Sequence, residues 1–380
     1  MADIDLSLDR SDMLGWLADY PRQLRELYPA GHRAGREAAR ARAGSDRPFS
    51  AVLVLGTGGG SAAAAYVALS LTRRRLTVPF DVCQGYDPPL YASAADRPPG
   101  TGGTSGRRDQ ARAGSVLVVA VSHSGDTEET LSAYDTLRGG AADPAVVAVT
   151  GGGRLAREAA REGHPVVALP TGMQARAAFP GILAALLGVL DGAGLTAGAG
   201  DFRAEVEEAA ALLADLARDW GPEAPDPPPL ALARETADRL LVVYGGAGPT
   251  EGVARRWKNQ LAENGKTLAH WYTVPEAHHD EVVGFDAPAD LRERLHVCLL
   301  RDDAAESPKM RRRLDVTRRL LSGRVAGVTE VEALGRSPLA RALSLCLYGD
   351  YLSCYVALLR GIDPTPVSVI LELKKVMAGG

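Results

Sequence analysis

The stretch from residue 116 to residue 130 constrains the fold more than any other part of the chain. Residues 116–121 are six apolar, mostly β-branched residues, which is the composition of a strand buried on both faces of a parallel sheet. Hydroxyl residues and a glycine follow, and then a helix begins. At such a strand-to-helix turn the first backbone N–H groups of the helix have no internal partner and carry the positive end of its dipole.

This turn is predicted to bind an anion. Ser122, Ser124 and Thr127 add hydroxyl donors, and Gly125 lets the backbone approach a ligand closely. A phosphate group fits such a helix start without needing a lysine. The alternative is an ordinary helix start, because Ser124, Asp126 or Thr127 would each serve as an N-cap.

Length and composition indicate an ordinary two-domain protein. The chain has 380 residues, of which 46% are hydrophobic and 24% are charged, as in soluble globular proteins. A net charge of -4 argues against nucleic acid as the main partner. We find no apolar run of membrane-spanning length in the sequence and no signal peptide at its start, and therefore expect a cytoplasmic protein. The four scattered cysteines are expected to be buried small apolar residues rather than a zinc site or disulfides.

Strands alternate with helices along the whole chain, which predicts parallel α/β sheets with ligands at the carboxyl ends of the strands. A helical arm over 9–42 precedes the first strand, and a glycine-rich linker near 192–200 separates two halves that resemble two copies of one doubly wound plan. We therefore predict one domain over 1–200 and another over 201–380. The predicted strands are 50–56, 78–83, 116–121, 145–150, 166–170, 295–300 and 324–328, and 240–248 is predicted to be a strand followed by a glycine turn. The main helices between them are 62–71, 154–162, 182–190, 205–219, 250–268 and 309–321.

A second glycine turn follows the strand 50–56, where Gly58, Gly59 and Gly60 lead into Ser61 and an alanine-rich helix. A Rossmann dinucleotide site is the rival interpretation. The G-x-G-x-x-G spacing is poor, and no acidic residue closes the next strand. A second phosphate or sugar contact, with Ser61 as the donor, is therefore favoured.

Three further segments are noted for their residue types. Arg176 lies where a polar segment meets the apolar helix 182–190, and could equally be a surface arginine. Residues 87–114 are rich in Pro, Gly, Ser, Thr and Arg, which predicts a flexible insertion. Glu263 lies near Asn264 and Lys266, and 278–281 reads His-His-Asp-Glu.

Such groups of carboxylates, an amide, a lysine and histidines suit proton-transfer chemistry. The alternatives are a solvated polar surface, or a metal site at His278 and His279. Neighbouring histidines on an extended segment point opposite ways, and no His-x-x-x-His spacing appears, so a metal is not expected.

Six motifs together resemble a known family, the double-SIS (sugar isomerase domain) phosphoglucose/phosphomannose isomerases of archaea and some bacteria. The resemblance implies two flavodoxin-like, SIS-type doubly wound domains, a helical N-terminal arm and a C-terminal helix. It also implies a cytoplasmic homodimer and an aldose–ketose isomerase that needs no metal or cofactor. The motifs lie at 54–61, 122–130, 174–178, 256–266, 275–281 and 363–374.

The resemblance also implies roles for individual residues. Arg176 would stabilise an enediolate, and Glu263 would move the proton between carbon 2 and carbon 1 of the sugar. His279 would open the sugar ring from the partner subunit, aided by Lys374. The sugar 6-phosphate would be bound at both turns of the first half, which contain Gly59, Gly60, Ser61, Ser122, Ser124 and Thr127.

The chain also departs from the family pattern. His278 and Asp280 stand where the family usually has asparagines, and Ala175 stands where it usually has proline. His123 replaces a tyrosine-like position and is either a contact to a charged substrate group or an exposed loop histidine, of which we favour the second. These departures leave two alternatives to the isomerase: a phosphosugar-sensing protein without turnover, and an isomerase of another phosphosugar.

Overall fold

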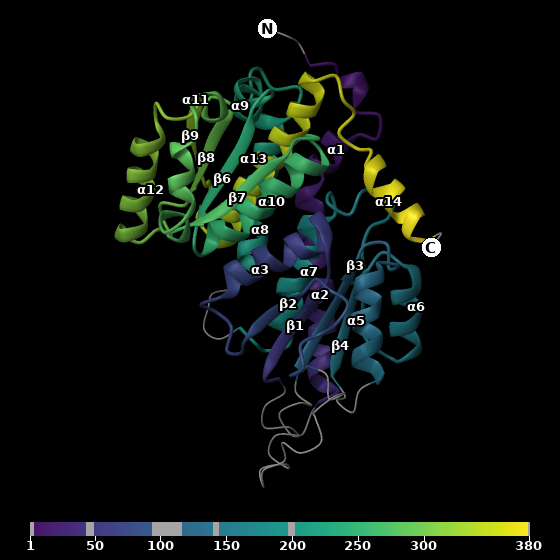
Figure 1. Cartoon of the computed structure of the whole chain (residues 1–380). Coiled ribbons are helices and arrows are strands. Elements are labelled where there is room, and N and C mark those ends of the chain that lie inside the picture. Colours follow the sequence, from purple (N-terminus) through teal and green to yellow (C-terminus); the bar gives the residue numbers. More distant parts are fainter. Residues whose placement is uncertain (1–3, 43–48, 93–115, 140–143, 197–201, 379–380) are drawn as a thin grey trace. The chain divides into compact units, whose positions relative to one another are not determined.

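The computed structural model describes residues 4–42, 49–92, 116–139, 144–196 and 202–378 (Figure 1). The chain forms two compact units. The first unit comprises residues 20–211 and 336–340, and the second unit comprises 1–19, 212–335 and 341–380. The predicted division at residue 200 stays a prediction, and most of the predicted insertion falls on residues 93–115, outside the described ranges.

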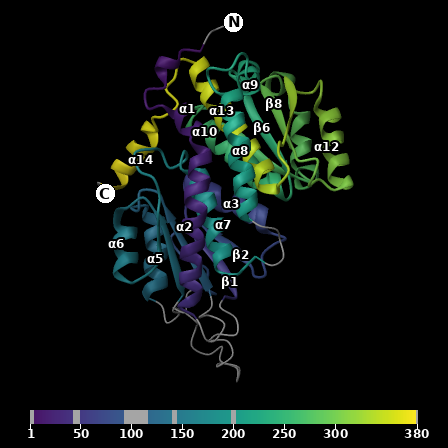
Figure 2. The same cartoon turned by 180° about the vertical axis from the view of Figure 1, so that it is seen from behind.

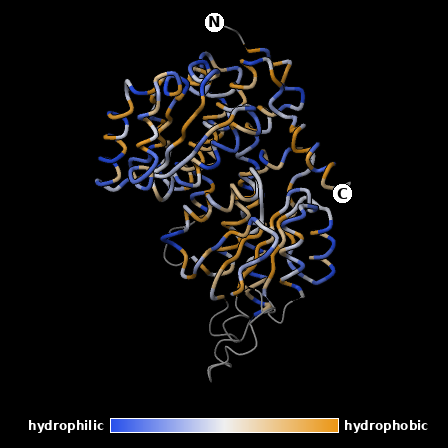
Figure 3. Tube along the Cα trace, in the orientation of Figure 1, coloured by the Kyte–Doolittle hydropathy of each residue, from blue (hydrophilic) through white to orange (hydrophobic). Residues whose placement is uncertain are grey.

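The first unit is built on a five-stranded parallel sheet with the order β2-β1-β3-β4-β5. This order is that of a flavodoxin-like doubly wound sheet, which confirms the predicted fold class. β1, β3 and β4 are apolar and buried along their whole length, and Figure 3 shows these central strands in the colours of hydrophobic residues. The strands are β1 (Ala51–Leu55), β2 (Phe80–Cys83), β3 (Val116–Ser122), β4 (Ala145–Thr150) and β5 (Val166–Ala168).

Helices cover both faces of this sheet. α2 and α7 run side by side on one face (Figure 2), and α5 packs against β3 and β1 on the other. Glycines bring α2 and α7 together: a Cβ at Gly31 would lie 2.2 Å from the Ala185 carbonyl oxygen, and one at Gly188 would lie 2.3 Å from that of Tyr28. The helices are α2 (Tyr20–Arg40), η2 (Gly58–Ala62), α3 (Ala63–Thr72), α5 (Glu128–Gly139), α6 (Gly153–Arg161) and α7 (Phe179–Gly192).

The second unit repeats the plan with four parallel strands in the order β7-β6-β8-β9. By position, β6, β7, β8 and β9 correspond to β1, β2, β3 and β4, in agreement with the predicted two copies. β7 was not among the predicted strands, and β9 begins three residues later than predicted. The strands are β6 (Leu240–Gly246), β7 (Ala269–Val274), β8 (Leu295–Arg301) and β9 (Gly327–Glu332).

The remaining helices include the N-terminal α1, whose Met13, Leu14 and Leu17 are buried, and the C-terminal α14. α10 packs along β6 and β7, and α12 contacts β7. The helices are η1 (Leu6–Leu8), α1 (Met13–Ala18), α8 (Phe202–Trp220), α9 (Pro228–Thr236), α10 (Pro249–Glu263), η3 (Glu276–His278), η4 (Glu281–Asp286), α11 (Ala289–Arg292), α12 (Pro308–Leu321), α13 (Pro338–Leu359) and α14 (Ser368–Ala378).

α13 corrects one expectation. Within the described residues it is the one helix long and apolar enough to cross a membrane by length and composition, so the expectation that no apolar run reaches that length is wrong. The most apolar window of α13 is 94% buried inside the protein. Such burial is typical of a helix at the centre of a protein core.

Candidate functional site

The turn after β3, where the sequence predicts an anion site, is held by hydrogen bonds among its own residues. The Ser122 hydroxyl lies 2.7 Å from the Thr127 hydroxyl and accepts the Gly125 N–H at 3.0 Å, while Ser124 accepts the Asp126 N–H at 3.2 Å. The Leu131 N–H bonds back to the Thr127 carbonyl, so the N–H groups of 128–130 precede the first bond of this helical turn. Ser122 is buried, whereas Ser124 is exposed.

Gly125 fixes the shape of this turn. Its φ is +75°, and a Cβ there would lie 1.8 Å from the Gly152 carbonyl oxygen, so a side chain is excluded by both conformation and space. Asp126 accepts the Arg154 N–H at 2.8 Å at the start of α6. The turn is therefore held against the next strand-to-helix loop of the same sheet.

His123 is not the exposed loop histidine that the sequence favoured, because it is partly buried. Its Nε2 lies 2.9 Å from the Pro170 carbonyl oxygen, which requires that Nε2 carry the proton and donate. Burial lowers the pKa of the imidazole, so the neutral ring is favoured. His123 is a partly buried anchor between the turn after β3 and the segment that follows β5.

The glycine turn after β1 lies at the neighbouring strand end and touches the segment that contains Arg176. A Cβ at Gly60 would lie 2.4 Å from the Ala175 carbonyl oxygen, and one at Gly56 would lie 3.0 Å from the Ser61 Cβ. Arg176 is buried, and its guanidinium donates to the Gln174 side chain at 3.3 Å. The structure therefore brings Gly59, Gly60, Ser61 and Arg176 together beside β1, next to the turn after β3.

In the second unit, Glu263 is the last residue of α10. Lys266, at a φ of +48°, donates from Nζ to the carbonyl oxygens of Glu263 at 2.5 Å and Pro364 at 2.8 Å, which closes the helix end with a cation. The Asn264 amide donates to the Ser353 hydroxyl at 3.0 Å on α13. The helix end that presents Glu263 is thus fixed on both sides.

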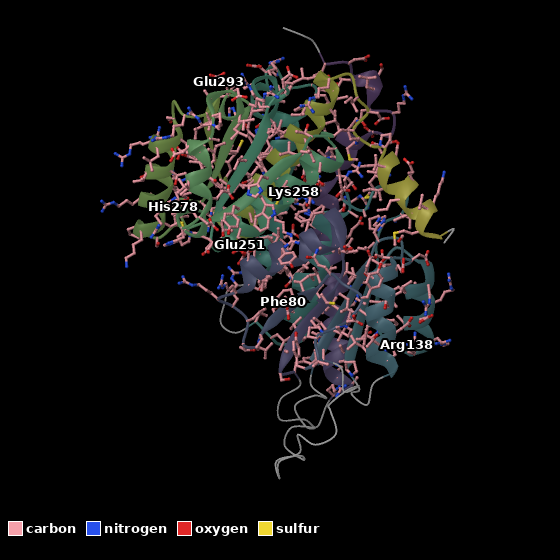
Figure 4. All side chains as sticks on the ribbon, viewed as in Figure 1. Phe80, Arg138, Glu251, Lys258, His278 and Glu293 are labelled. Carbon is pink, nitrogen blue, oxygen red and sulfur yellow. The ribbon has the colours of Figure 1, made fainter. Side chains whose placement is uncertain are left out.

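The segment 275–281 separates its two histidines. His278 is partly buried and lies 2.7 Å from the Thr317 hydroxyl and 3.0 Å from the Arg313 guanidinium, both on α12, beside which Figure 4 labels it. His279 is exposed. The environment therefore leaves His279, and not His278, accessible to a ligand.

The acidic residues after His279 are bonded to the sheet. Tyr272 on β7 donates to Asp280 at 2.9 Å, Tyr244 on β6 donates to Glu281 at 2.5 Å, and the His270 Nε2 lies 2.7 Å from Glu281. Burial and Glu281 raise the pKa of Tyr244, so its hydroxyl remains a donor. Sequence reasoning missed Tyr244 and His270, because nothing in a strand's local pattern marks which side chain meets a carboxylate 37 or 11 residues away.

Glu263 and His279 lie at opposite ends of one layer of the second unit. α10 starts at the carboxyl end of β6 and must run back before β7 begins, because β6 and β7 are parallel. Its 15 residues span roughly 22 Å at about 1.5 Å per residue. β7 then returns to the carboxyl end of the sheet, where His279 follows. Figure 4 marks this direction with Glu251 and Lys258 along α10.

Lys374 lies on α14 and is exposed. The same helix exposes large apolar side chains, with Val369 at 79% and Val376 at 70%. Of the predicted residues, the structure therefore joins Ser122 with Thr127 and the glycine turn with Arg176, and places Glu263, His279 and Lys374 on three separate elements of the second unit. Within the described ranges, no three or more His, Cys, Asp or Glu side chains are arranged to hold a metal ion.

Comparison with known proteins places these features in a family. Residues 226–377 match the family model of the bacterial phospho-glucose isomerase C-terminal SIS domain. A bifunctional phosphoglucose/phosphomannose isomerase of Caldicellulosiruptor bescii is 37% identical over 265 residues, which are 69% of this chain and 76% of the relative. Its counterpart in Aquifex aeolicus is 29% identical over 332 residues, 86% of this chain and 90% of that protein.

A solved structure extends the likeness to the fold of nearly the whole chain. That of a hypothetical protein from Thermus thermophilus has a TM-score of 0.67 and 19% identity, and covers 97% of this chain and 91% of its own. At that identity the likeness concerns the fold alone. The matches in sequence confirm the predicted resemblance, and the chain belongs to the family of bifunctional phosphoglucose/phosphomannose isomerases.

Proposed function

We propose that this protein is an aldose–ketose isomerase that interconverts glucose 6-phosphate or mannose 6-phosphate with fructose 6-phosphate. The observation that carries the proposal is the turn after β3, where hydroxyls and helix-start N–H groups surround a position suited to a phosphate in a chain of this family. The protein acts in the cytoplasm on a small phosphorylated sugar.

The first unit binds the phosphate. Ser124 and the N–H groups of 128–130 donate to its oxygens, and Ser61 donates from the adjacent turn. Ser122 and Thr127 hold the turn through their mutual hydrogen bond and turn their hydroxyls to the phosphate when it is bound. Gly59 and Gly60 let the ligand approach the backbone.

The chemistry is a proton transfer through an enediolate. With the sugar in its open form, the Glu263 carboxylate takes the proton from carbon 2, and the charge that moves to oxygen 1 is stabilised by Arg176. The hydroxyl proton then passes from oxygen 2 to oxygen 1, and Glu263 returns its proton to carbon 1, which gives the ketose. Every step is carried by a side chain, and none calls for a metal or a cofactor.

Ring opening uses His279 and Lys374, with His279 contributed by the partner subunit of a homodimer. Two observations support this arrangement. The length of α10 separates His279 from Glu263 within one chain, and His279 is exposed beyond the carboxyl end of its own sheet. The apolar face of α14 is also typical of a surface that a partner covers.

Proton exchange tests the proposal. The purified protein is incubated with fructose 6-phosphate in deuterated water, and NMR follows the products and the label at carbon 2. Glucose or mannose 6-phosphate carrying deuterium at carbon 2 is the expected result. Binding without exchange, seen as a thermal shift with fructose 6-phosphate, would instead favour a phosphosugar-sensing protein.

A further inference from the structure

The two residues on either side of His279 are anchored to different elements, while the described residues show no side-chain hydrogen bond or ion pair to His279 itself. His278 is bonded to α12 and Asp280 to β7. Ala277, just before them, is buried in the core of this unit. The backbone of His279 is thus held on both sides, and its imidazole is exposed.

The hydrogen bonds that join His278, Arg313 and Thr317 define the protonation state of His278. The Arg313 guanidinium can only donate, so the His278 Nδ1 must accept at 3.0 Å. The Nε2 then carries the proton and donates to the Thr317 hydroxyl at 2.7 Å. The Thr317 hydroxyl donates in turn to the Arg313 carbonyl oxygen at 2.8 Å. Each donor meets an acceptor only when His278 is neutral.

We infer that His278, Arg313 and Thr317 form a positioning clamp, which fixes the direction of the His279 imidazole and holds only while His278 is unprotonated. The inference rests on the role proposed above for His279.

Protonation of His278 breaks the clamp. A proton on Nδ1 would face the N–H groups of Arg313 and remove the acceptor. Burial, then Arg313 on α12 and the neighbouring His279 on its own segment, lower the pKa of His278 from its usual value. The clamp is therefore intact at neutral pH and opens as the pH falls through this lowered pKa.

Kinetics of three variants test the clamp. For His278→Ala we expect about a tenfold lower kcat for fructose 6-phosphate with little change in KM, because misplacing a catalytic group slows the reaction without removing phosphate contacts. His278→Asn keeps an acceptor for Arg313, so it is expected to retain most of the wild-type kcat. Because asparagine cannot be protonated, the decrease of kcat at low pH that His278 causes should disappear. His279→Ala reports the full loss of the ring-opening group.

His296→Asn is the matched control. His296 is also a buried histidine of the second unit with a lowered pKa, bonded to Thr329 at 2.9 Å, but it lies at the start of β8. This variant is expected to change stability and to leave kcat unchanged.

Side-chain NMR of histidine-labelled protein separates failure of the clamp from failure of the proposed function. The expected spectrum shows His278 in the neutral tautomer with the proton on Nε2, and shows a His279 ring that becomes more mobile in His278→Ala. An unaltered His279 signal in that variant, or an unaltered kcat while His279→Ala is inactive, would overturn the clamp alone. Full turnover in His279→Ala would overturn the role of His279, whatever the spectra show.

Discussion

β3 and β8 occupy the same place in their two sheets and end in opposite ways. Each has seven residues. β3 lies between β1 and β4 in its sheet, and β8 lies between β6 and β9. β3 ends in Ser122, and its turn offers hydroxyls and N–H groups. β8 ends in Arg301, which bonds to the carboxylates of Glu306, Asp315 and Glu330.

The first glycine turns differ in the same sense. After β1, Gly60 lies against Ala175, beside Arg176. After β6, the Gly246 N–H is taken by the Thr250 hydroxyl at 2.8 Å, and a Cβ at Gly246 would lie 3.3 Å from the Met310 side chain. One plan has thus been used twice: β3 of the first copy ends in hydroxyls and N–H groups, and the second copy closes its strand ends with its own side chains.

The sharpest test of this division concerns the residue proposed to do the chemistry, which the second unit supplies. Glu263→Gln is expected to lower kcat at least about 10³-fold, because an amide cannot accept the carbon 2 proton. Binding of fructose 6-phosphate, measured by calorimetry, is expected to persist, because the proposed phosphate site belongs to the first unit. Glu251→Gln, at the other end of α10, is the control, and retained turnover in Glu263→Gln would remove Glu263 from its role.

The closed end of β8 is expected to matter for stability and not for binding. Arg301→Met should lower the free energy of unfolding by about 3 kcal/mol, because it leaves carboxylates such as the buried Glu306 without their cation. Urea unfolding measures this loss, and the KM for fructose 6-phosphate should not change. Arg336→Met, which removes a largely exposed ion pair with Glu208, should cost less than about 1 kcal/mol. Equal losses in the two variants would contradict the comparison.

At the end of β3, by contrast, a substitution is expected to affect substrate binding as well as stability. Ser122→Ala is expected to raise KM about tenfold and to lower the free energy of unfolding by about 1 kcal/mol, as one hydrogen-bonding hydroxyl is lost. Steady-state kinetics and urea unfolding on the same preparation give both quantities. Ser322→Ala, at a helix end of the second unit, should leave KM unchanged. An unchanged KM in Ser122→Ala would place the phosphate elsewhere.

The smallest effect is a pH dependence that both units share. Burial lowers the pKa values of His123, His278 and His296 below 6.5, so the folded protein favours their neutral forms. Their contribution to stability is complete above pH 6.5 and is lost as the pH falls from there toward the lowered pKa values, because the unfolded chain takes up the protons first. Unfolding midpoints across this range measure the slope, and His123→Gln should reduce it. A slope that stays the same would mean that the pKa of His123 is not lowered in the folded protein.

Local pattern was sufficient for the strands that lie in the centre of a sheet. β1, β3 and β4 are almost entirely apolar, β8 contains an apolar run over residues 297–300, and the ends of these runs are marked by glycine or polar residues. β7 was missed because Ala269–Val274 is a partly exposed edge strand that includes His270 and Trp271. α10 ends five residues earlier than predicted, because Lys266 ends it through contacts with carbonyl groups, one of them 98 residues away.

The same distinction between local and distant contacts applies to the candidate site. The turn after β3 could be predicted because its donors are consecutive in sequence. The anchoring of His123 by Pro170 and of His278 by α12 could not, because each bond joins residues 47 or 35 positions apart. The roles of Glu263, Arg176, His279 and Lys374 remain predictions.

The length of α10 also has a consequence for mixtures of chains. Glu263 and His279 lie at opposite ends of the α10–β7 layer. In the proposed arrangement, where His279 serves the other subunit of a homodimer, a chain lacking one residue and a chain lacking the other are each inactive alone. In a dimer of one chain of each kind, one site contains both Glu263 and His279, and the other site contains neither. Two inactive variants would then regain activity when mixed. The activity of the protein would depend on dimerisation as well as on the concentration of chains.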